Sequence, residues 1–351
     1  MNAATADTNS NTPALVCDQL GPRLIGVALR PWPLPALGPA DVRVAMHAVA
    51  LNFPDLLMTE GLYQFKPPVP YIPGMEGSGV VIEAGPASGW AVGQRVGLGG
   101  KHGLLAEQVV VPGASLRTLP AGLAMDEAAA VMVTGLTAWV ALARIGHLQR
   151  GETLLVHGAR GGVGWACVQL GLHLGARVIA TATQPERLAE LAALGVLVLP
   201  STGFRAAVLE ATQGRGADVV ADPVGGDVFD ESGRCVAFGG RLLVLGFASG
   251  RIATVDSNRP LIKGYSVVGV RAGEYGRHFP QHHLEHLAAV NRLAESGVLR
   301  PHIGARFALD DAKAALEAMA SRSVTGKIVV TMPAFGGAQS KLQGQTLSAP
   351  G

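Results

Sequence analysis

The feature that most constrains this chain is a glycine-rich turn between two apolar, strand-like runs at 153–157 and 177–182. The turn contains Gly158, Ala159, Arg160, Gly161, Gly162, Val163 and Gly164, and a helix-like stretch follows it. Unpaired backbone N–H groups and the helix dipole favour an anion at the N-terminus of such a helix. The spacing is a relative of the GxGxxG fingerprint in its required strand–turn–helix–strand context, so it predicts a dinucleotide site. The alternative is a tight turn that binds nothing.

Composition excludes several other classes of function. Charged residues make up 15% of the chain and the net charge is +2, which argues against a nucleic-acid or polybasic membrane surface. The first dozen residues lack the basic and apolar parts of a secretory signal. The apolar stretch 128–143 is too short to span a bilayer and predicts a buried helix. Three scattered cysteines without a CxxC pair favour a cytoplasmic location.

The pattern of strands and helices predicts two domains and two tails. Residues 1–12 and 334–351 are polar or Gly/Ser/Gln-rich and predict flexible tails. Short β-rich runs at 42–51, 79–84, 95–98 and 107–111 predict a small barrel-like domain over 13–133. Alternating strands and helices over 134–271 predict a doubly wound sheet of about six parallel strands. The last segment, 272–333, predicts two helices and two strands that return to the first domain.

Three further segments make a family resemblance specific. They read NFPDLLMTEGLY at 52–63, YIPGMEGSG at 71–79 and DVVADPVGG at 218–226. With HGARGGVG at 157–164 and TGKIVV at 325–330, they resemble the zinc-independent quinone oxidoreductase branch of the medium-chain dehydrogenase/reductase superfamily. The resemblance covers residues 14–332 and implies an α/β fold, a Rossmann doubly wound parallel sheet inserted into a GroES-like β-barrel catalytic domain. It also implies an active site in the cleft between the domains, and a homodimer.

Compared with zinc-containing members of that superfamily, this chain lacks ligands. Leu51 and Asn52 occupy the segment of the first ligand cysteine, and Met75 stands where a ligand histidine would be. Three scattered cysteines cannot form a four-cysteine structural site, so no metal is expected. Without a Lewis acid, an alkoxide lacks its usual stabilisation. Conjugated acceptors, quinones or α,β-unsaturated carbonyls, need only a hydrogen-bond donor at the developing oxygen charge.

A histidine-rich segment at 278–286 offers one competing metal motif. His282, His283, Glu285 and His286 fit the H-x-x-E-H pattern of inverted zincins. No third strong ligand is evident, so a solvated histidine-rich helix face is the favoured interpretation, and the role of the segment stays open.

Two residues are candidates for the catalytic site by resemblance. Tyr63 matches the family tyrosine that faces the nicotinamide and substrate, and a phenol donates a hydrogen bond at neutral pH. The alternative is an aromatic side chain packed over the 67–70 segment. Asn52 offers an amide to substrate or ribose, or it stabilises a turn. Asp55 is expected to cap the helix that contains residues 56–58.

The second strand favours NADPH over NADH. NAD sites place a carboxylate about 20 residues after the glycine turn, whereas this strand ends in Thr183. Thr183 and Glu186 predict a capping box, and Arg187 occupies the family position of a basic residue for the 2′-phosphate. Arg160 replaces the small residue usual in the turn, and it either contacts phosphate or points into solvent.

Further cofactor contacts are implied only by the resemblance. They are Thr137, Gly246, Phe247, Val270 and Lys327. A threonine that bonds back to its own helix is the alternative for Thr137, and a surface lysine is the alternative for Lys327.

These features together predict an NADPH-dependent quinone or enone reductase. An enoyl-thioester reductase is the nearest alternative, although an enoyl-CoA or acyl-carrier substrate would favour a basic entry surface. A non-catalytic NADPH-binding protein of crystallin or regulatory type is the alternative from another class.

Overall fold

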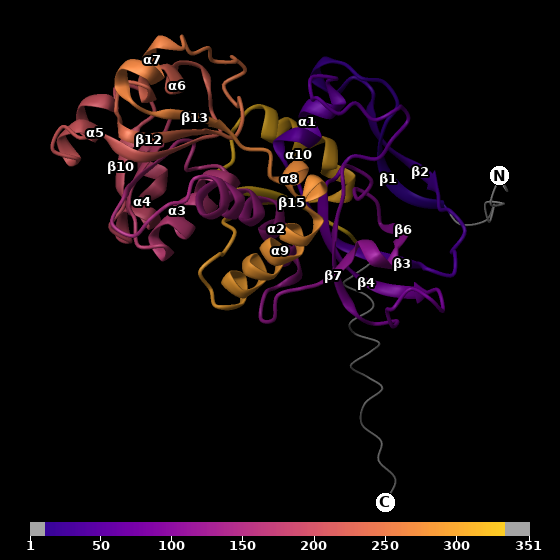
Figure 1. Cartoon of the computed structure of the whole chain (residues 1–351). Coiled ribbons are helices and arrows are strands. Elements are labelled where there is room, and N and C mark those ends of the chain that lie inside the picture. Colours follow the sequence, from indigo (N-terminus) through magenta and orange to yellow (C-terminus); the bar gives the residue numbers. More distant parts are fainter. Residues whose placement is uncertain (1–10, 334–351) are drawn as a thin grey trace, which may run out of the picture. The chain divides into compact units, whose positions relative to one another are not determined.

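The computed structural model describes residues 11–333 and divides the chain into two compact units (Figure 1). Of the described residues, the β unit contains 11–130 and 303–333, and the α/β unit runs from Val131 to His302. The sequence had grouped 272–302 with the first domain, but here it belongs to the α/β unit. The reason is packing: a Cβ added at Gly135 would meet Val290 at 2.9 Å and Leu299 at 3.2 Å.

The β unit is built mainly from antiparallel strands. The first two, β1 (Asn11–Cys17) and β2 (Val27–Pro33), pair with each other. A seven-stranded sheet has the order β14-β15-β3-β4-β5-β7, with β6 on β3. Its strands are β3 (Asp41–Ala50), β4 (Glu76–Ala84), β5 (Arg95–Gly99), β6 (Gln108–Pro112), β7 (Leu116–Thr118), β14 (Ile303–Ala308) and β15 (Lys327–Thr331). The pairing of β15 with β3 confirms that the end of the chain returns to this unit.

The prediction of a flexible tail over residues 1–12 is wrong for its last two residues. Asn11 and Thr12 lie in β1 opposite Pro33 and Trp32. Thr12 is buried and its hydroxyl accepts a hydrogen bond from the Gln108 N–H at 3.0 Å. Cross-strand pairing therefore outweighs the polar composition of this segment. Residues 1–10 and the expected tail at 334–351 lie outside the described residues.

The α/β unit has the predicted doubly wound sheet. Its strands are all parallel, in the order β10-β9-β8-β11-β12-β13. They are β8 (Thr153–Val156), β9 (Arg177–Ala182), β10 (Leu197–Pro200), β11 (Ala217–Asp222), β12 (Val236–Val244) and β13 (Ser266–Gly269). The helices are α3 (Gly162–His173), α4 (Ala189–Ala193), α5 (Arg205–Ala211), α6 (Gly226–Ser232), α7 (Asn258–Lys263), α8 (Ala272–His278) and α9 (Pro280–Glu295).

Three remaining helices complete the description. They are α1 (Phe53–Thr59), α10 (Ala312–Ala320) and α2 (Met125–Trp139), which continues as a π-helical segment to Ile145. Among the described residues, Met125–Ile145 is the one helix long and apolar enough to cross a membrane, and 67% of its most apolar window is buried. The predicted buried helix is confirmed, but at 21 residues it is longer than the 128–143 stretch.

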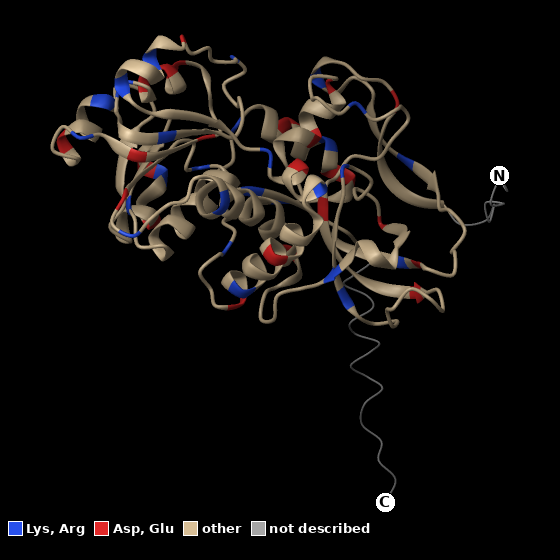
Figure 2. Ribbon diagram, in the orientation of Figure 1, with Lys and Arg blue, Asp and Glu red and all other residues tan. Residues whose placement is uncertain are grey.

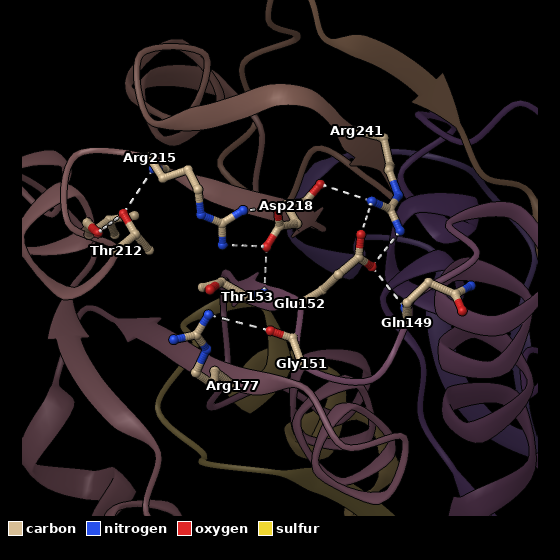
Figure 3. A network of polar contacts seen from close by, with 11 residues as sticks. Gln149, Gly151, Glu152, Thr153, Arg177, Thr212, Arg215, Asp218 and Arg241 are labelled. Atoms are coloured by element: carbon tan, nitrogen blue, oxygen red, sulfur yellow. Dashed lines mark hydrogen bonds and ion pairs between the residues drawn. The ribbon is translucent and has the colours of Figure 1, made fainter.

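Charged residues of both signs are spread over both units (Figure 2). One network ties the amino ends of the parallel strands (Figure 3). Arg215 and the Thr153 N–H both donate to Asp218, and Arg241 forms a two-bond ion pair with Glu152 at 2.7 Å. Hydrogen bonds from these arginines hold the pKa of both carboxyls below their usual range, although burial opposes this. The network holds together the amino ends of the strands, at the end of the sheet opposite to the glycine turn.

Candidate functional site

The glycine turn between β8 and α3 leaves no room for side chains at two positions. Gly158 has a φ of 60°, which L side chains rarely adopt. A Cβ at Gly164 would lie 2.4 Å from the Gly158 carbonyl oxygen. Gly161 is the N-cap of α3, so the backbone N–H groups of the first helical turn have no helical partner. The turn therefore brings a bare backbone and the positive end of a helix to the carboxyl edge of the sheet.

Two neighbouring strand ends complete this edge. The Asp222 carboxylate accepts hydrogen bonds from the N–H groups of Val224 (2.7 Å) and Gly225 (2.9 Å). Burial raises the pKa of Asp222, while these two bonds lower it. A Cβ at Gly225 would meet the ring of Phe247 at 2.9 Å, and one at Gly158 would meet Val224 at 3.1 Å.

The predicted cofactor residues Gly158 and Phe247 thus lie against the same 222–226 turn. Gly246 is close to it too, since an added Cβ would lie 3.2 Å from the Pro223 carbonyl oxygen. Val270 follows β13 and its N–H donates to the Val244 carbonyl at 2.9 Å. Sequence reasoning missed the turn-forming role of Asp222, although an Asp at a strand end before Pro-Val-Gly-Gly is a turn signal.

At the end of β9, Arg160 reaches across from the glycine turn. It donates to the Gln184 side-chain oxygen at 2.7 Å and to the Thr183 hydroxyl at 3.5 Å. Burial, and then the nearby charge of Arg187, lower the pKa of Arg160, and Glu186 opposes them. The predicted residues Arg160, Thr183 and Arg187 are therefore brought together at one corner of the sheet.

The predicted Thr183–Glu186 capping box is wrong. The segment Pro185–Leu188 is a 3-10 helix whose N-cap is Gln184, without a side-chain cap. Pro185 fits the first helical position, and it shifts the helix start one residue beyond Thr183.

A buried histidine supports the glycine turn from inside the unit, and sequence reasoning missed it. His157 lies fully buried at the end of β8, with Nδ1 2.8 Å from the Thr181 hydroxyl and Nε2 2.7 Å from the Ser232 hydroxyl. The Ser232 hydroxyl donates to the Val228 carbonyl, so it accepts from His157, and Nε2 carries the proton. Burial lowers the pKa of His157 to about 3. A neutral hydrogen-bond chain thus links β9, β8 and α6.

In the β unit, four buried polar side chains form a second cluster, which we call the Lys327 cluster: Asn52, Asp55, Glu76 and Lys327. The Lys327 ammonium donates to the Leu51 carbonyl (2.7 Å), the Asn52 side-chain oxygen (2.8 Å) and Glu76 (2.9 Å). Lys327 is 4% exposed, so it is not the surface lysine that was the alternative.

Asn52 and Asp55 join this cluster to the start of α1. Both amide hydrogens of Asn52 are used, one toward the Ala50 carbonyl and one toward Glu76. Asp55 accepts from the Asn52 N–H (2.8 Å) and the Gly74 N–H (3.0 Å). Burial raises the pKa of Asp55 to about 7, against these two bonds and the charge of Lys327. The geometry supports the turn-stabilising role for Asn52 and the expected capping role for Asp55.

The other two site candidates lie elsewhere. Tyr63 is half-buried in the loop after α1 and packs against the core of the β unit. Thr137 lies in α2, where its hydroxyl donates to the Val133 carbonyl at 2.7 Å. This is the back-bonding geometry that was the alternative for Thr137.

The histidine-rich segment forms part of the α8–α9 hairpin. His286 is buried against Tyr275, with the ring centroids 5.7 Å apart, so a solvated face is wrong for this residue. Arg144 donates to the Tyr275 hydroxyl at 2.7 Å. Within residues 11–333, no group of three or more His, Cys, Asp or Glu side chains is arranged to hold a metal ion.

Comparison with known proteins identifies the family. Residues 38–121 match the family described as "Alcohol dehydrogenase GroES-like domain", and residues 162–289 match "Zinc-binding dehydrogenase". The Nematostella vectensis "Quinone oxidoreductase-like protein 2 homolog" is 36% identical over 324 residues, which cover 90% of this chain and 88% of that protein. The chain belongs to the quinone oxidoreductase-like branch of the medium-chain dehydrogenase/reductase superfamily.

Solved members of this superfamily share the fold over almost their whole length. The mycobacterial protein Rv1454c, solved in complex with NADPH, is 28% identical with a TM-score of 0.82, covering 91% of this chain and 99% of that one. JamJ enoyl reductase in its apo form is 26% identical with a TM-score of 0.81, covering 92% and 100%. The Pseudomonas syringae quinone oxidoreductase is 31% identical with a TM-score of 0.82, covering 91% and 99%. Quinone oxidoreductase and enoyl reductase members are therefore both among the structural neighbours.

The zinc and nicotinamide groups known in this superfamily fit the chain differently. Asn52 and Met75 occupy the segments where the family resemblance leads us to expect zinc ligands, and the Lys327 ammonium is 2.9 Å from Glu76, so these residues do not fit a zinc ion. The α/β unit fits a dinucleotide, because a Cβ at Gly164 would fill the turn and α3 begins at its edge.

Proposed function

We propose that this protein is an NADPH-dependent, zinc-independent reductase of quinones or α,β-unsaturated carbonyl compounds. The observation that carries the NADPH assignment is the pair of arginines at the end of β9. Arg160 and Arg187 lie close enough for their charges to interact, at the position where an NAD site would place a carboxylate. A 2′-phosphate carries negative charge and accepts the hydrogen bonds that guanidinium groups donate.

The chain's own residues have four roles in this proposal. The glycine turn and the start of α3 bind the pyrophosphate, and Arg160, Thr183 and Arg187 bind the 2′-phosphate. The turn at 222–226 and Phe247 line the nicotinamide end. The nicotinamide supplies a hydride when NADPH is bound. Tyr63 donates a hydrogen bond to the acceptor oxygen, where negative charge develops.

An acceptor panel tests the proposal. We expect the purified protein to oxidise NADPH with a quinone or a small enone, and to do so at least tenfold more efficiently than NADH. The Tyr63→Phe variant should lose about 10- to 100-fold in kcat with NADPH affinity unchanged, since it removes one donor to the developing charge. Unchanged turnover of this variant on every accepted substrate would remove Tyr63 from the mechanism.

An enoyl-thioester reductase is the second candidate, and one observation favours it. Lys101 is exposed and its ammonium lies 4.4 Å from the centroid of Phe65, two residues after Tyr63. A cation there offers a contact for the phosphates of a coenzyme A thioester. An enoyl-CoA in the same panel separates the two candidates. Tight NADPH binding with no turnover of any acceptor would instead indicate a binding protein.

We also propose that the chain forms a homodimer through the free edge of the parallel sheet. β13 is the terminal strand there, and the apolar side chains of Phe238, Leu261 and Ile262 are 86%, 82% and 75% exposed. Leu261→Asp should convert a dimer into a monomer in sedimentation experiments, whereas Leu284→Asp, at an exposed position of α9, should not. A wild-type monomer would contradict this assignment. The three buried free thiols are compatible with a cytoplasmic location.

A further inference from the structure

The Lys327 cluster lies at the base of the segment that joins β3 to β4, which contains α1 and carries Tyr63. We call this segment the 52–76 loop and its two ends the stems. One stem of this loop contributes Leu51, Asn52 and Asp55, and the other contributes Gly74 and Glu76. Lys327 comes from a third segment and donates to both stems, to Leu51 and Asn52 on one and to Glu76 on the other. Asp55 also joins the stems, because its two oxygens accept from the Asn52 and Gly74 N–H groups.

The bonding leaves no ammonium hydrogen for a ligand. An ammonium group has three donors and no acceptor, and the three partners of Lys327 are oxygens at 2.7–2.9 Å. The same rule orients Asn52: only its oxygen can face Lys327, so its NH₂ group faces Ala50 and Glu76. A cofactor contact through Lys327 would therefore require one of these buried bonds to break.

We infer that Lys327 is a positioning residue, which clamps the two stems of the 52–76 loop and so holds Tyr63, and that it is not a cofactor ligand. Its effect on turnover rests on the proposed function, whereas its effect on the loop does not. Removing the ammonium takes from the buried Glu76 carboxylate the cation that is hydrogen-bonded to it at 2.9 Å, and the loss of such a buried partner is costly. The loop stems then separate, and the loop loses protection from hydrogen exchange.

Lys327→Ala provides the test, because propylammonium has the atoms that this change removes. We expect the apparent melting temperature to fall by roughly 10 °C and exchange in residues 60–73 to rise at least tenfold. Propylammonium should restore both in a saturable way, and tetramethylammonium, which has no N–H donor, should not. The Kd for NADPH, measured by fluorescence, should stay within about twofold, while kcat falls and is rescued by propylammonium. Lys313→Ala, a lysine of α10 in the same unit, is the matched control.

Two results would overturn the inference. One is a tenfold weaker NADPH affinity in Lys327→Ala with unchanged loop exchange, which would make Lys327 a cofactor ligand. The other is the absence of any propylammonium effect beyond that on the Lys313→Ala control. If Lys327→Ala does not fold, the double variant Lys327→Met/Glu76→Gln should fold because it removes both charges of the buried ion pair together. A double variant that also fails to fold counts against the clamp.

Failure of the proposed function is distinguishable from failure of this inference. If no acceptor is reduced, the melting temperature, the exchange of the loop and the rescue by propylammonium still report on Lys327. If turnover is found but the loop is unaffected by the substitution, the reductase stands and the clamp fails.

Discussion

Each unit contains basic residues that the sequence alone assigns to cofactor binding, but the structure places them in opposite environments. In the β unit, Lys327 is 4% exposed and donates to three protein oxygens. In the α/β unit, Arg187 is exposed and Arg160 lies beside it at a strand end, with the two charges close enough to interact. A buried cation with a full set of acceptors holds the protein together, whereas two adjacent cations at an exposed site favour a bound anion, even with the charge of Glu186 beside them. The difference separates a structural cation from the pair of arginines that we propose binds the 2′-phosphate.

The largest effect that would sharpen this comparison is expected from Arg187→Glu. This change replaces attraction to a 2′-phosphate by repulsion, so the Kd for NADPH should rise roughly 100-fold while that for NADH changes less than about threefold. Arg160→Ala should give a smaller loss, about tenfold, because it removes one of the two cations.

Fluorescence titration with both nucleotides measures these affinities without any acceptor. Arg150→Glu is the control, because Arg150 is exposed and lies beside Gly175 at the opposite edge of the sheet. Equal losses of NADPH and NADH affinity in Arg187→Glu would place the 2′-phosphate elsewhere and remove the contrast with Lys327.

Much of the fold could be predicted because its signals are local. The apolar run at 177–182 is bounded by turn residues and coincides with β9. Gly158 marks a positive φ, and Gly164 marks a close approach of the helix to the turn. β1 could not be predicted in full, since Asn11 and Thr12 are polar and are ordered by pairing with β2.

The candidate site was only half predictable, because some of its contacts join residues that are far apart in the sequence. Arg160 and Thr183 follow from motifs spaced along one βαβ unit. The contact of Lys327 with Asn52 joins residues 275 positions apart, and no local pattern records it. The chain through His157 likewise depends on hydroxyls from β9 and α6. A motif can identify a basic residue as a candidate, but its role depends on the partners that the fold brings to it.

A smaller effect should separate the two units by the pH dependence of their stability. His157 in the α/β unit has a pKa of about 3, below its ordinary 6.5, so only the unfolded chain gains a proton as pH falls from 6.5. The free energy of unfolding of this unit should therefore fall on acidification, by up to about 1.4 kcal/mol per pH unit. Burial also lowers the pKa of His286 in the same unit, which adds to this slope, whereas Asp222, whose pKa burial raises, opposes it.

In the β unit, Asp55 acts in the opposite sense. Its pKa of about 7 lies above the ordinary 3.8, so the folded unit gains a proton that the unfolded chain does not, and acidification from pH 7 stabilises it. His47 and His102, whose pKa values burial lowers, oppose Asp55, so the β unit should have the flatter slope.

Hydrogen exchange at pH 6.5 and 5.0, corrected for intrinsic rates, measures both units in one sample. This window lies above the ordinary pKa of the carboxyls paired with arginine, so their contribution is small. His157→Gln should flatten the slope of the α/β unit, and His147→Gln, at an exposed position of the same unit, should not. Equal slopes in the two units would contradict the opposite effects of acid predicted from Asp55 in the β unit and His157 in the α/β unit.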